Sequence, residues 1–227
     1  MTKVKICGIT RAEDALDSFR LGADLIGLIF IKGTPRAVPE SRAIEILEAA
    51  RKNGYTSGFT GLFMDSPVDE VSDMVVRCGI DHVQLHGDES PEYCERLENV
   101  LLGKGARGVK LLKVLKVGTD GIIHPGGKSC RDYLCVDYFV FDTYDKDFHG
   151  GTGKVFNWDV LRKRIRDINK PFFLAGGLDP DNVARAVLEL SPFGVDVSSG
   201  VEKLTAIKDK VLLREFIKNA KKTGPTG

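Results

Sequence analysis

Residues 4–30, VKICGITRAEDALDSFRLGADLIGLIF, hold two strand-like runs with a helix-like stretch between them. The runs at 4–7 and 25–30 are short and apolar, which is typical of buried strands. Thr10 predicts a helix N-cap, and Glu13 three residues later would complete a capping box. The apolar residues of this stretch follow at helical spacing and form one stripe: Ala12, Ala15, Leu16 and Phe19. The stretch therefore predicts a strand, a helix and a second strand, the repeating unit of parallel α/β folds.

The same alternation continues along the whole chain. Strand-like runs are expected at 4–7, 25–30, 61–64, 82–85, 109–117, 138–141, 171–174 and 194–197. Helical stripes follow at 12–19, 43–50, 71–78, 93–101, 158–168, 183–190 and 213–220. After the fifth strand, the glycine-rich residues 118–128 leave room only for a short helix at 130–136.

Eight such units in 227 residues favour a single closed (βα)8 TIM barrel. The alternative is an open doubly wound sheet, which usually needs only about five or six units. We expect the barrel domain to span residues 1–222, followed by a frayed tail at 223–227.

The composition points away from several kinds of partner. The chain has 33 basic and 32 acidic residues without a basic block, so we expect neither nucleic acid nor a membrane as partner. No apolar run approaches the roughly 20 residues that span a bilayer, and the chain enters a strand at once, without room for a signal peptide. Five scattered cysteines indicate reduced thiols and a cytoplasmic protein. The four histidines lack metal-ligand spacing, so we expect no metal.

Small residues follow the last two predicted strands. In parallel barrels the chemistry lies at the C-terminal ends of the strands and in the loops that follow them. Gly176-Gly177 come after the seventh strand, and Ser199-Gly200 after the eighth. Glycine lets the backbone approach a ligand closely, and backbone N–H groups bind phosphate well. These two neighbouring strand ends favour a phosphate site, with a plain tight turn as the alternative.

Five further residues fall near the same ends. Cys7 ends the first strand, although a single cysteine is more often a small buried apolar residue. Asp142 follows an apolar run, where a carboxylate is costly unless it faces a polar barrel mouth. Arg36, after the second strand, is either a solvated charge or a clamp for a substrate carboxylate. Gly151 lies in the glycine-rich segment 150–153, which is either a linker or a loop over the mouth. His86 could reach the mouth, but we expect it to orient a loop.

Together these segments resemble the phosphoribosylanthranilate isomerase family. The resemblance rests on six motifs in order, each at a strand end: KICGIT at 5–10, TPRAV at 34–38, VQLHGDE at 83–89, FDT at 141–143 with GGTGK at 150–154, AGGL at 175–178, and GVDVSSGVE at 194–202. Two stretches depart from the family. No Pro-Gly pair follows Glu202, and residues 118–128 are longer and richer in glycine than the family pattern.

The resemblance implies a cofactor-independent Amadori rearrangement of N-(5-phosphoribosyl)anthranilate. It implies that Asp142 is the general acid and Cys7 the general base, so the site should shift the pKa of each group toward neutrality. Arg36 would hold the anthranilate carboxylate, and the backbone after the last two strands would hold the phosphate. The substrate-binding residues implied in this way are Arg36, Gly151, Gly176, Gly177, Ser199 and Gly200.

Two other functions stay open at this point. Isomerase barrels of histidine biosynthesis are similar, but they generally use a pair of aspartates, whereas the first strand here ends in Cys7. A non-catalytic barrel that binds phosphorylated ligands is the second alternative, and it would need neither Cys7 nor Asp142. In every case we expect a small phosphorylated ligand and a monomer or homodimer.

Overall fold

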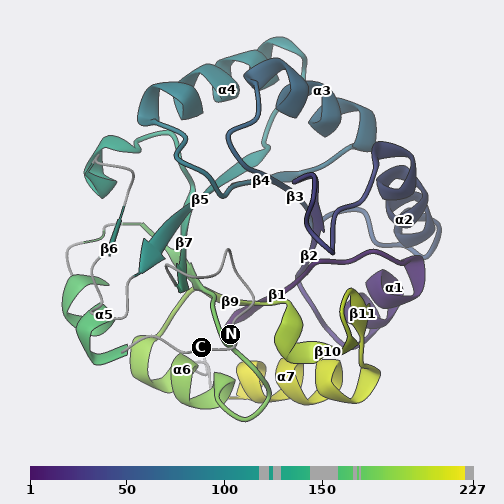
Figure 1. Cartoon of the computed structure of the whole chain (residues 1–227), viewed down its shortest axis with the longest axis vertical. Helices are drawn as coiled ribbons and strands as arrows, with labels where there is room; N and C mark the ends of the chain where they lie inside the picture. Colours follow the sequence, from purple (N-terminus) through teal and green to yellow (C-terminus); the bar gives the residue numbers. More distant parts are fainter. Residues whose placement is uncertain (118–122, 125–128, 144–157, 166–167, 169, 223–227) are drawn as a thin grey trace.

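The computed structural model describes residues 1–117, 123–124, 129–143, 158–165, 168 and 170–222. Within them, eight parallel strands form a closed ring, and helices surround it on the outside (Figure 1). The ring consists of β1 (Lys3–Cys7), β2 (Leu25–Ile29), β3 (Phe59–Phe63), β4 (His82–Leu85), β5 (Lys110–Val117), β7 (Tyr138–Thr143), β8 (Phe172–Leu174) and β9 (Gly194–Val197).

Parallel pairing continues from strand to strand around the ring. It closes because β1 pairs with both β2 and β9, while β4 pairs with β5. The predicted (βα)8 TIM barrel is therefore confirmed, and the open-sheet alternative is wrong. Because all eight strands run in the same direction, their C-terminal ends lie at one rim of the ring.

The outer helices pack their apolar stripes against the ring. They are α1 (Ala12–Arg20), α2 (Glu40–Lys52), α3 (Val68–Cys78), α4 (Pro91–Gly103), α5 (Trp158–Ile165), α6 (Val183–Leu190) and α7 (Lys210–Lys222). All stripe residues predicted for the last two helices are buried: Val183, Ala186, Val187, Leu190, Leu213, Phe216, Ile217 and Ala220. Between the strands, a smaller apolar cluster packs together: Leu25, Leu112, Val114, Val140, Phe173 and Ala175. Alternating strand residues thus serve two cores, one inside the ring and one beneath the helices.

The fifth helical position differs from the prediction. Instead of a helix over 130–136, the chain forms a single-turn 3₁₀ helix, η1 (Cys130–Asp132). Ser129 and Asp132 cap this turn reciprocally, with Asp132 accepting from the Ser129 N–H at 3.0 Å. Tyr133 then leaves the helical path, and its buried hydroxyl donates to the carbonyl of Glu89 at 3.0 Å. The turn ends because the Tyr133 backbone, at φ −81° and ψ 66°, is no longer helical.

Three short strands lie outside the eightfold pattern. β6 (Ile123–His124) pairs antiparallel with β5, and β10 (Glu202–Leu204) pairs with β11 (Ile207–Lys208) in a hairpin after β9. This hairpin overturns the predicted cap at Thr10. The Thr10 hydroxyl donates to the Ala206 carbonyl in the hairpin at 2.7 Å, and α1 instead has Arg11 at its N-cap. A long-range bond has replaced a local one.

Two other helices begin in different ways. Ser90 caps α4, accepting from the Tyr93 N–H at 3.2 Å. Ser66 does not cap α3, because that helix begins at Val68 with Pro67 at the N-cap. No helix in the described part of the chain is long and apolar enough to cross a membrane. The domain limits 1–222 and the tail 223–227 stay predictions.

Candidate active site

The predicted site residues lie at the C-terminal rim of the ring. Cys7 is the last residue of β1, and Asp142 is the penultimate residue of β7. Gly176-Gly177 follow β8, and Ser199 and Gly200 belong to a 3₁₀ helix, η2 (Ser199–Val201), that follows β9. Parallel strands therefore bring these parts of the chain to the same end of the barrel. Gly151 lies outside the described residues.

Cys7 is a buried thiol surrounded by charged side chains. Its exposed fraction is 6%, and its pKa is raised, because burial outweighs Lys5 and Lys208, which act in the opposite direction. The predicted shift of the Cys7 pKa toward neutrality is therefore wrong for the protein without substrate. Gly8, directly after it, has a φ of 73°, and a Cβ at this position would lie 2.7 Å from Cδ of Arg36. Glycine at this position therefore lets the arginine pass over the end of β1.

A buried ion pair lies beneath Cys7. Nζ of Lys5 donates to Oδ2 of Asp196 at 2.8 Å, and both residues are buried. Burial alone would lower the pKa of Lys5, but the charges of Asp196 and Cys7 outweigh it and leave the pKa raised. Lys5 is therefore an ammonium ion at neutral pH. Sequence analysis overlooked this residue, although the alternation along β1 already placed Lys5 and Cys7 on one face.

Arg36 is held at the rim by Glu202. The segment after β2 folds back, with Val38 N–H donating to the Ile29 carbonyl at 2.9 Å. Nε and Nη2 of Arg36 then donate to the two carboxylate oxygens of Glu202, at 2.8 Å and 2.7 Å. Nζ of Lys208 donates to the same carboxylate at 2.9 Å. The arginine side chain is 19% exposed, so it is not a solvated surface charge.

This ion pair leaves Arg36 with further donors. A guanidinium carries five N–H groups, and the pair with Glu202 uses one edge of it. The hydrogen bonds that Arg36 donates to Glu202 raise the pKa of the guanidinium group. Its outer edge can therefore meet a carboxylate or another planar anion as a fixed cation.

Asp142 lies beside His86 on the opposite side of the ring from β2. Oδ2 of Asp142 and Nε2 of His86 are 3.7 Å apart, and the two side chains are 23% and 22% exposed. Burial, with the charges of Lys113 and Lys116, lowers the pKa of His86 to about 4. The imidazole is therefore neutral at pH 7. Of the two roles expected for His86, this contact favours the one in which the side chain reaches the mouth over the one in which it orients a loop, because the ring lies beside Asp142.

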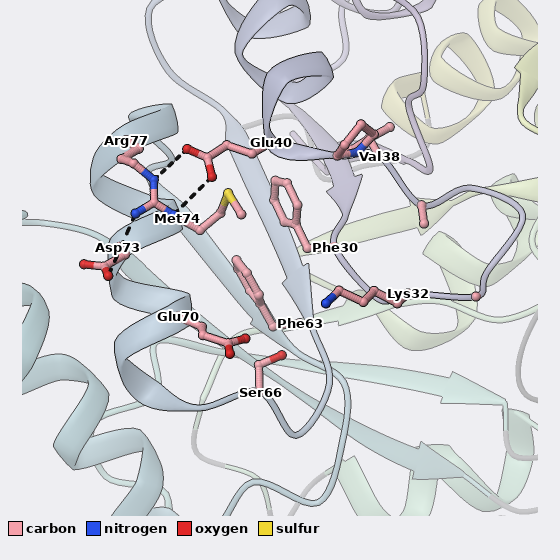
Figure 2. Close-up of a pocket in the computed structure, with 13 residues that line it drawn as sticks. Phe30, Lys32, Val38, Glu40, Phe63, Ser66, Glu70, Asp73, Met74 and Arg77 are labelled. Atoms are coloured by element: carbon pink, nitrogen blue, oxygen red, sulfur yellow. Dashed lines mark hydrogen bonds and ion pairs between the residues drawn. The ribbon is translucent and has the colours of Figure 1, made fainter.

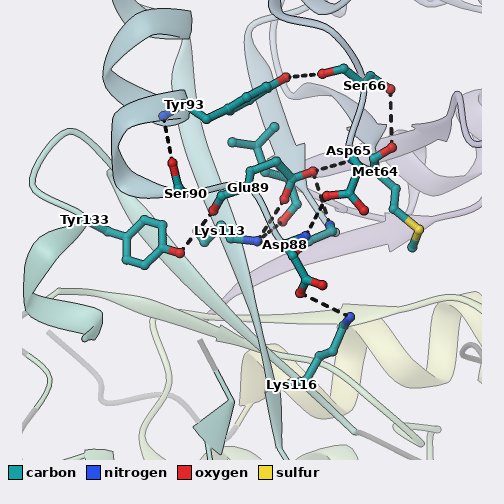
Figure 3. Close-up of polar contacts among 12 residues, drawn as sticks. Met64, Asp65, Ser66, Asp88, Glu89, Ser90, Tyr93, Lys113, Lys116 and Tyr133 are labelled. Carbon is teal, nitrogen blue, oxygen red and sulfur yellow. Dashed lines mark hydrogen bonds and ion pairs between the residues drawn. The ribbon is translucent and has the colours of Figure 1, made fainter. Parts of the chain in front are cut away.

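The loop that carries His86 is fixed by a buried network instead (Figure 3). Nζ of Lys113 donates to Oε2 of Glu89 at 2.9 Å and to the Gly87 carbonyl at 2.6 Å. The other oxygen of Glu89 accepts from the N–H groups of Asp65, at 2.9 Å, and Gly87, at 3.2 Å. The Glu89 carboxylate thus connects the segments after β3 and β4 to Lys113 in the middle of β5. Of the VQLHGDE motif, Glu89 fixes the loop and His86 faces the mouth.

Gly176-Gly177 and Gly200 form a close backbone contact between the last two strand ends. Gly176 and Gly177 have φ values of 81° and 65°, in the left-handed region that favours glycine. Nδ2 of Asn182 donates to the Gly177 carbonyl at 2.9 Å and holds this turn. A Cβ on Gly200 would lie 2.0 Å from the Leu178 carbonyl oxygen, so only glycine fits there.

The backbones of two glycine-containing loops therefore meet at this corner of the rim. Backbone N–H groups bind anions well, and glycine leaves them accessible. The Ser198 hydroxyl beside them is buried, with no hydrogen-bond partner within the described structure. Of the two interpretations of these glycines, this arrangement favours the phosphate site over the plain tight turn.

A cavity lies between α2 and α3, away from the predicted site residues (Figure 2). Its volume is about 570 Å³, and the stacked rings of Phe30 and Phe63, 5.2 Å apart, form an apolar wall. Arg77 and Glu40 close one side through an ion pair at 2.6 Å. Its described lining comes from the segment after β2, from α2 and from α3, rather than from the predicted site. The cavity therefore adds no group to the chemistry at the mouth.

A metal site is not visible in the part of the chain that the structure describes, where no three His, Cys, Asp or Glu side chains gather closely enough. The absence of a metal or cofactor stays a prediction. The groups that are present can transfer protons and bind anions. Fold and rim together define the class of the protein: a (βα)8-barrel enzyme whose polar site lies at the C-terminal ends of its strands.

The chain belongs to the N-(5'-phosphoribosyl)anthranilate isomerase family, whose model matches residues 4–219. The isomerase of Geotalea uraniireducens is 41% identical over 223 residues, which cover 97% of this chain and 99% of that protein. The crystal structure of phosphoribosyl anthranilate isomerase from Thermotoga maritima is 32% identical, with a TM-score of 0.79 over 98% of this chain and 100% of that one.

A further solved relative was crystallised with a ligand. It is a phosphoribosyl anthranilate isomerase in complex with reduced 1-(o-carboxyphenylamino)-1-deoxyribulose 5-phosphate. It is 30% identical to this chain, with a TM-score of 0.75 over 98% of this chain and all of that one. The resemblance predicted from the sequence motifs is thus confirmed.

Proposed function

We propose that this chain converts N-(5-phosphoribosyl)anthranilate to 1-(o-carboxyphenylamino)-1-deoxyribulose 5-phosphate, the third step of tryptophan synthesis from chorismate. It belongs to the isomerase family of that reaction along nearly its whole length. A relative binds a reduced form of the product. The observation that carries the proposal is that Cys7, Asp142, Arg36 and the glycine corner all lie at one rim.

The reaction needs an acid and then a base. We assign the acid to Asp142, which would protonate the ribose ring oxygen so that the ring opens to a Schiff base. We assign the base to Cys7, whose thiolate would take the proton from C2′, and the enolamine then collapses to the ketone. Neutral His86, 3.7 Å from Asp142, adds no positive charge that would hold that carboxyl ionised.

Two anion contacts would hold the substrate between these groups. The outer edge of Arg36 suits the anthranilate carboxylate, because a guanidinium binds a carboxylate with two parallel hydrogen bonds. The backbone of Gly176, Gly177, Ser199 and Gly200 suits the phosphate. Anchoring both ends fixes the reacting carbon, and such positioning can lower a barrier by several kcal/mol.

Turnover of the purified full chain with N-(5-phosphoribosyl)anthranilate tests the proposal. We expect product formation without added metal or cofactor, and no turnover of the corresponding histidine-pathway aminoaldose, because Cys7 replaces one of the two aspartates of those enzymes. Turnover of the histidine-pathway substrate alone would favour that alternative. Binding of the substrate without turnover would favour the non-catalytic barrel.

Two further points belong to the same proposal. The Thermotoga maritima relative is described as dimeric, and monomers of it have also been crystallised. For this chain both states, monomer and homodimer, remain open to a measurement of mass in solution. A cytoplasmic location, with no nucleic acid or membrane partner, is proposed from the even charge balance and the scattered cysteines.

A further inference from the structure

The buried pair beneath Cys7 shares a small space with the sulfur. Lys5 and Cys7 lie two residues apart on β1, so their side chains point to the same face of the strand. Cys7 is paired in register with Gly27 on β2. A Cβ on Gly27 would lie 3.0 Å from Sγ of Cys7 and 3.2 Å from Nζ of Lys5. The ammonium group and the sulfur therefore flank the same point.

Burying the Lys5–Asp196 ion pair costs free energy of hydration. Lys5 has no exposed surface, and Asp196 has almost none. Oδ2 of Asp196 accepts from Lys5, while its Oδ1 is buried without a hydrogen-bond partner among the described residues. A buried ion pair adds little stability over apolar side chains of the same volume, because both charges lose their hydration. Stability alone therefore does not account for the pair.

Four charged groups from four parts of the rim act on the Cys7 sulfur. Lys5 from β1 and Asp196 from β9 are joined by Lys208 from β11 and by Arg36 from the segment after β2. Glu202 binds both Arg36 and Lys208, so one of their two positive charges is compensated. Among the opposing effects on the pKa of Cys7, burial is the largest and the charge of Lys5 comes next.

We propose that Lys5 is a positioning residue of the isomerase site: its ammonium group, held by Asp196, carries the charge that allows the buried Cys7 sulfur to exist as a thiolate. This inference rests on the proposed function, in which Cys7 is the base. The thiolate takes the C2′ proton and becomes a thiol, while the electron pair of the C–H bond enters the enolamine. Lys5 keeps its proton throughout and touches neither substrate nor product.

The test measures the reactivity of Cys7 separately from turnover. Because the thiolate is the nucleophile, the rate of alkylation of Cys7 by iodoacetamide follows its ionisation. The rate is measured against pH on the full chain by mass spectrometry of the Cys7 peptide. In Lys5→Met we expect Cys7 alkylation at pH 8 to be roughly tenfold slower, with the profile moved to higher pH. Lys5→Arg should retain most of the native profile.

Two further variants separate charge from structure. Lys113→Met removes a lysine from the equally buried pair with Glu89, 2.9 Å, and should leave the Cys7 profile in place. The double variant Lys5→Met with Asp196→Leu replaces the whole pair by apolar groups, which protects folding, and should still move the profile upward. Thermal unfolding confirms that each variant is folded.

The outcomes are distinguishable from failure of the proposed function. An unmoved Cys7 profile in the folded double variant would overturn the role of Lys5, even if Cys7→Ala is inactive. Native turnover of Cys7→Ala would instead remove Cys7 from the mechanism, whatever Lys5 does to the sulfur. An equal shift in Lys113→Met would show a general loss of structure and would also overturn the proposal.

Discussion

Arg36 and Glu202, 166 residues apart in the chain, form a two-pronged ion pair at the barrel mouth. Nε donates to Oε1 at 2.8 Å and Nη2 to Oε2 at 2.7 Å. Burial would raise the pKa of Glu202, but Arg36 and Lys208 outweigh it and leave the pKa lowered, so the carboxylate is charged. The guanidinium is thus held in one orientation before any substrate arrives, which reduces the entropy lost on binding.

We expect Glu202→Gln to weaken substrate binding more than chemistry. Glutamine keeps the size of the side chain but removes the charge that holds the arginine fork. KM for N-(5-phosphoribosyl)anthranilate should rise about tenfold, with kcat within about threefold of native, because Arg36 contacts the substrate in both ground and transition states. Steady-state kinetics at saturating and limiting substrate separates the two constants.

Glu45→Gln is the matched control. Glu45 pairs with Arg42 at 2.7 Å, but both side chains are largely exposed. Exposed pairs contribute about 0–1 kcal/mol, so this variant should match the native enzyme in KM, kcat and stability. If Glu202→Gln and Glu45→Gln have identical kinetics, the Arg36–Glu202 pair does not contribute to substrate binding.

Replacing either proposed proton-transfer group should abolish most turnover. Asp142→Asn and Cys7→Ala are each expected to lower kcat about 10²-fold or more, with KM within a few-fold of native. Cys130→Ala, at a half-buried cysteine of η1, is the control and should keep native kcat. Near-native turnover of Asp142→Asn would assign the acid to another residue.

Much of the fold can be predicted from local sequence patterns. The short apolar run 138–141, bounded by Asp137 and Asp142, forms β7 within two residues of the prediction, and the run 194–197 forms β9 as predicted. The helices on the outside repeat their apolar residues every three or four positions. The predicted helix at 130–136 is wrong, because the backbone leaves the helical conformation at Tyr133, whose side chain bonds to a carbonyl 44 residues away. No local pattern contains that contact.

The site divides in the same way. Cys7, Asp142 and the glycines were predictable because each directly ends or follows a strand. The supporting charges were not, since Lys5 meets Asp196 across 191 residues and Arg36 meets Glu202 across 166. Those partners depend on ring closure, which brings β9 beside β1. Only the position of Lys5 two residues before Cys7 offered a local signal.

We expect Gly200→Ala to damage the phosphate corner. Its Cβ would lie 2.0 Å from the Leu178 carbonyl oxygen, a backbone atom that cannot move aside cheaply. The two loops must separate, so KM should rise more than tenfold and the free energy of unfolding should fall by about 1–3 kcal/mol. Isothermal titration with inorganic phosphate would give the loss of anion affinity directly.

The control for this substitution is Gly103→Ala. Gly103 ends α4, and no described atom lies within 4 Å of a Cβ at this position. Alanine favours a helix over glycine, so the variant should be as stable as the native chain or more stable by about 0.5–1 kcal/mol. Native phosphate affinity in Gly200→Ala would contradict the assignment of this corner to the phosphate.

His86 should make the protein sensitive to acid. Its pKa is lowered to about 4, chiefly by burial and then by Lys113 and Lys116, whereas a histidine in the unfolded chain titrates near 6.5. Between pH 4 and about pH 6.5, His86 is therefore protonated in the unfolded chain but neutral in the folded protein. The stability that the neutral imidazole contributes is therefore complete above about pH 6.5 and is lost as the pH falls toward 4.

The measurement compares urea unfolding of the native chain and His86→Gln at pH 7 and pH 4.5. Between these two pH values the native chain should lose about 2 kcal/mol more unfolding free energy than the variant, because only the native chain carries this titration. Glutamine also changes the contacts of the ring, which shifts the variant's stability equally at both pH values. The difference between the two losses isolates the proton, and equal losses would mean that His86 takes up its proton as readily in the folded barrel as in the unfolded chain.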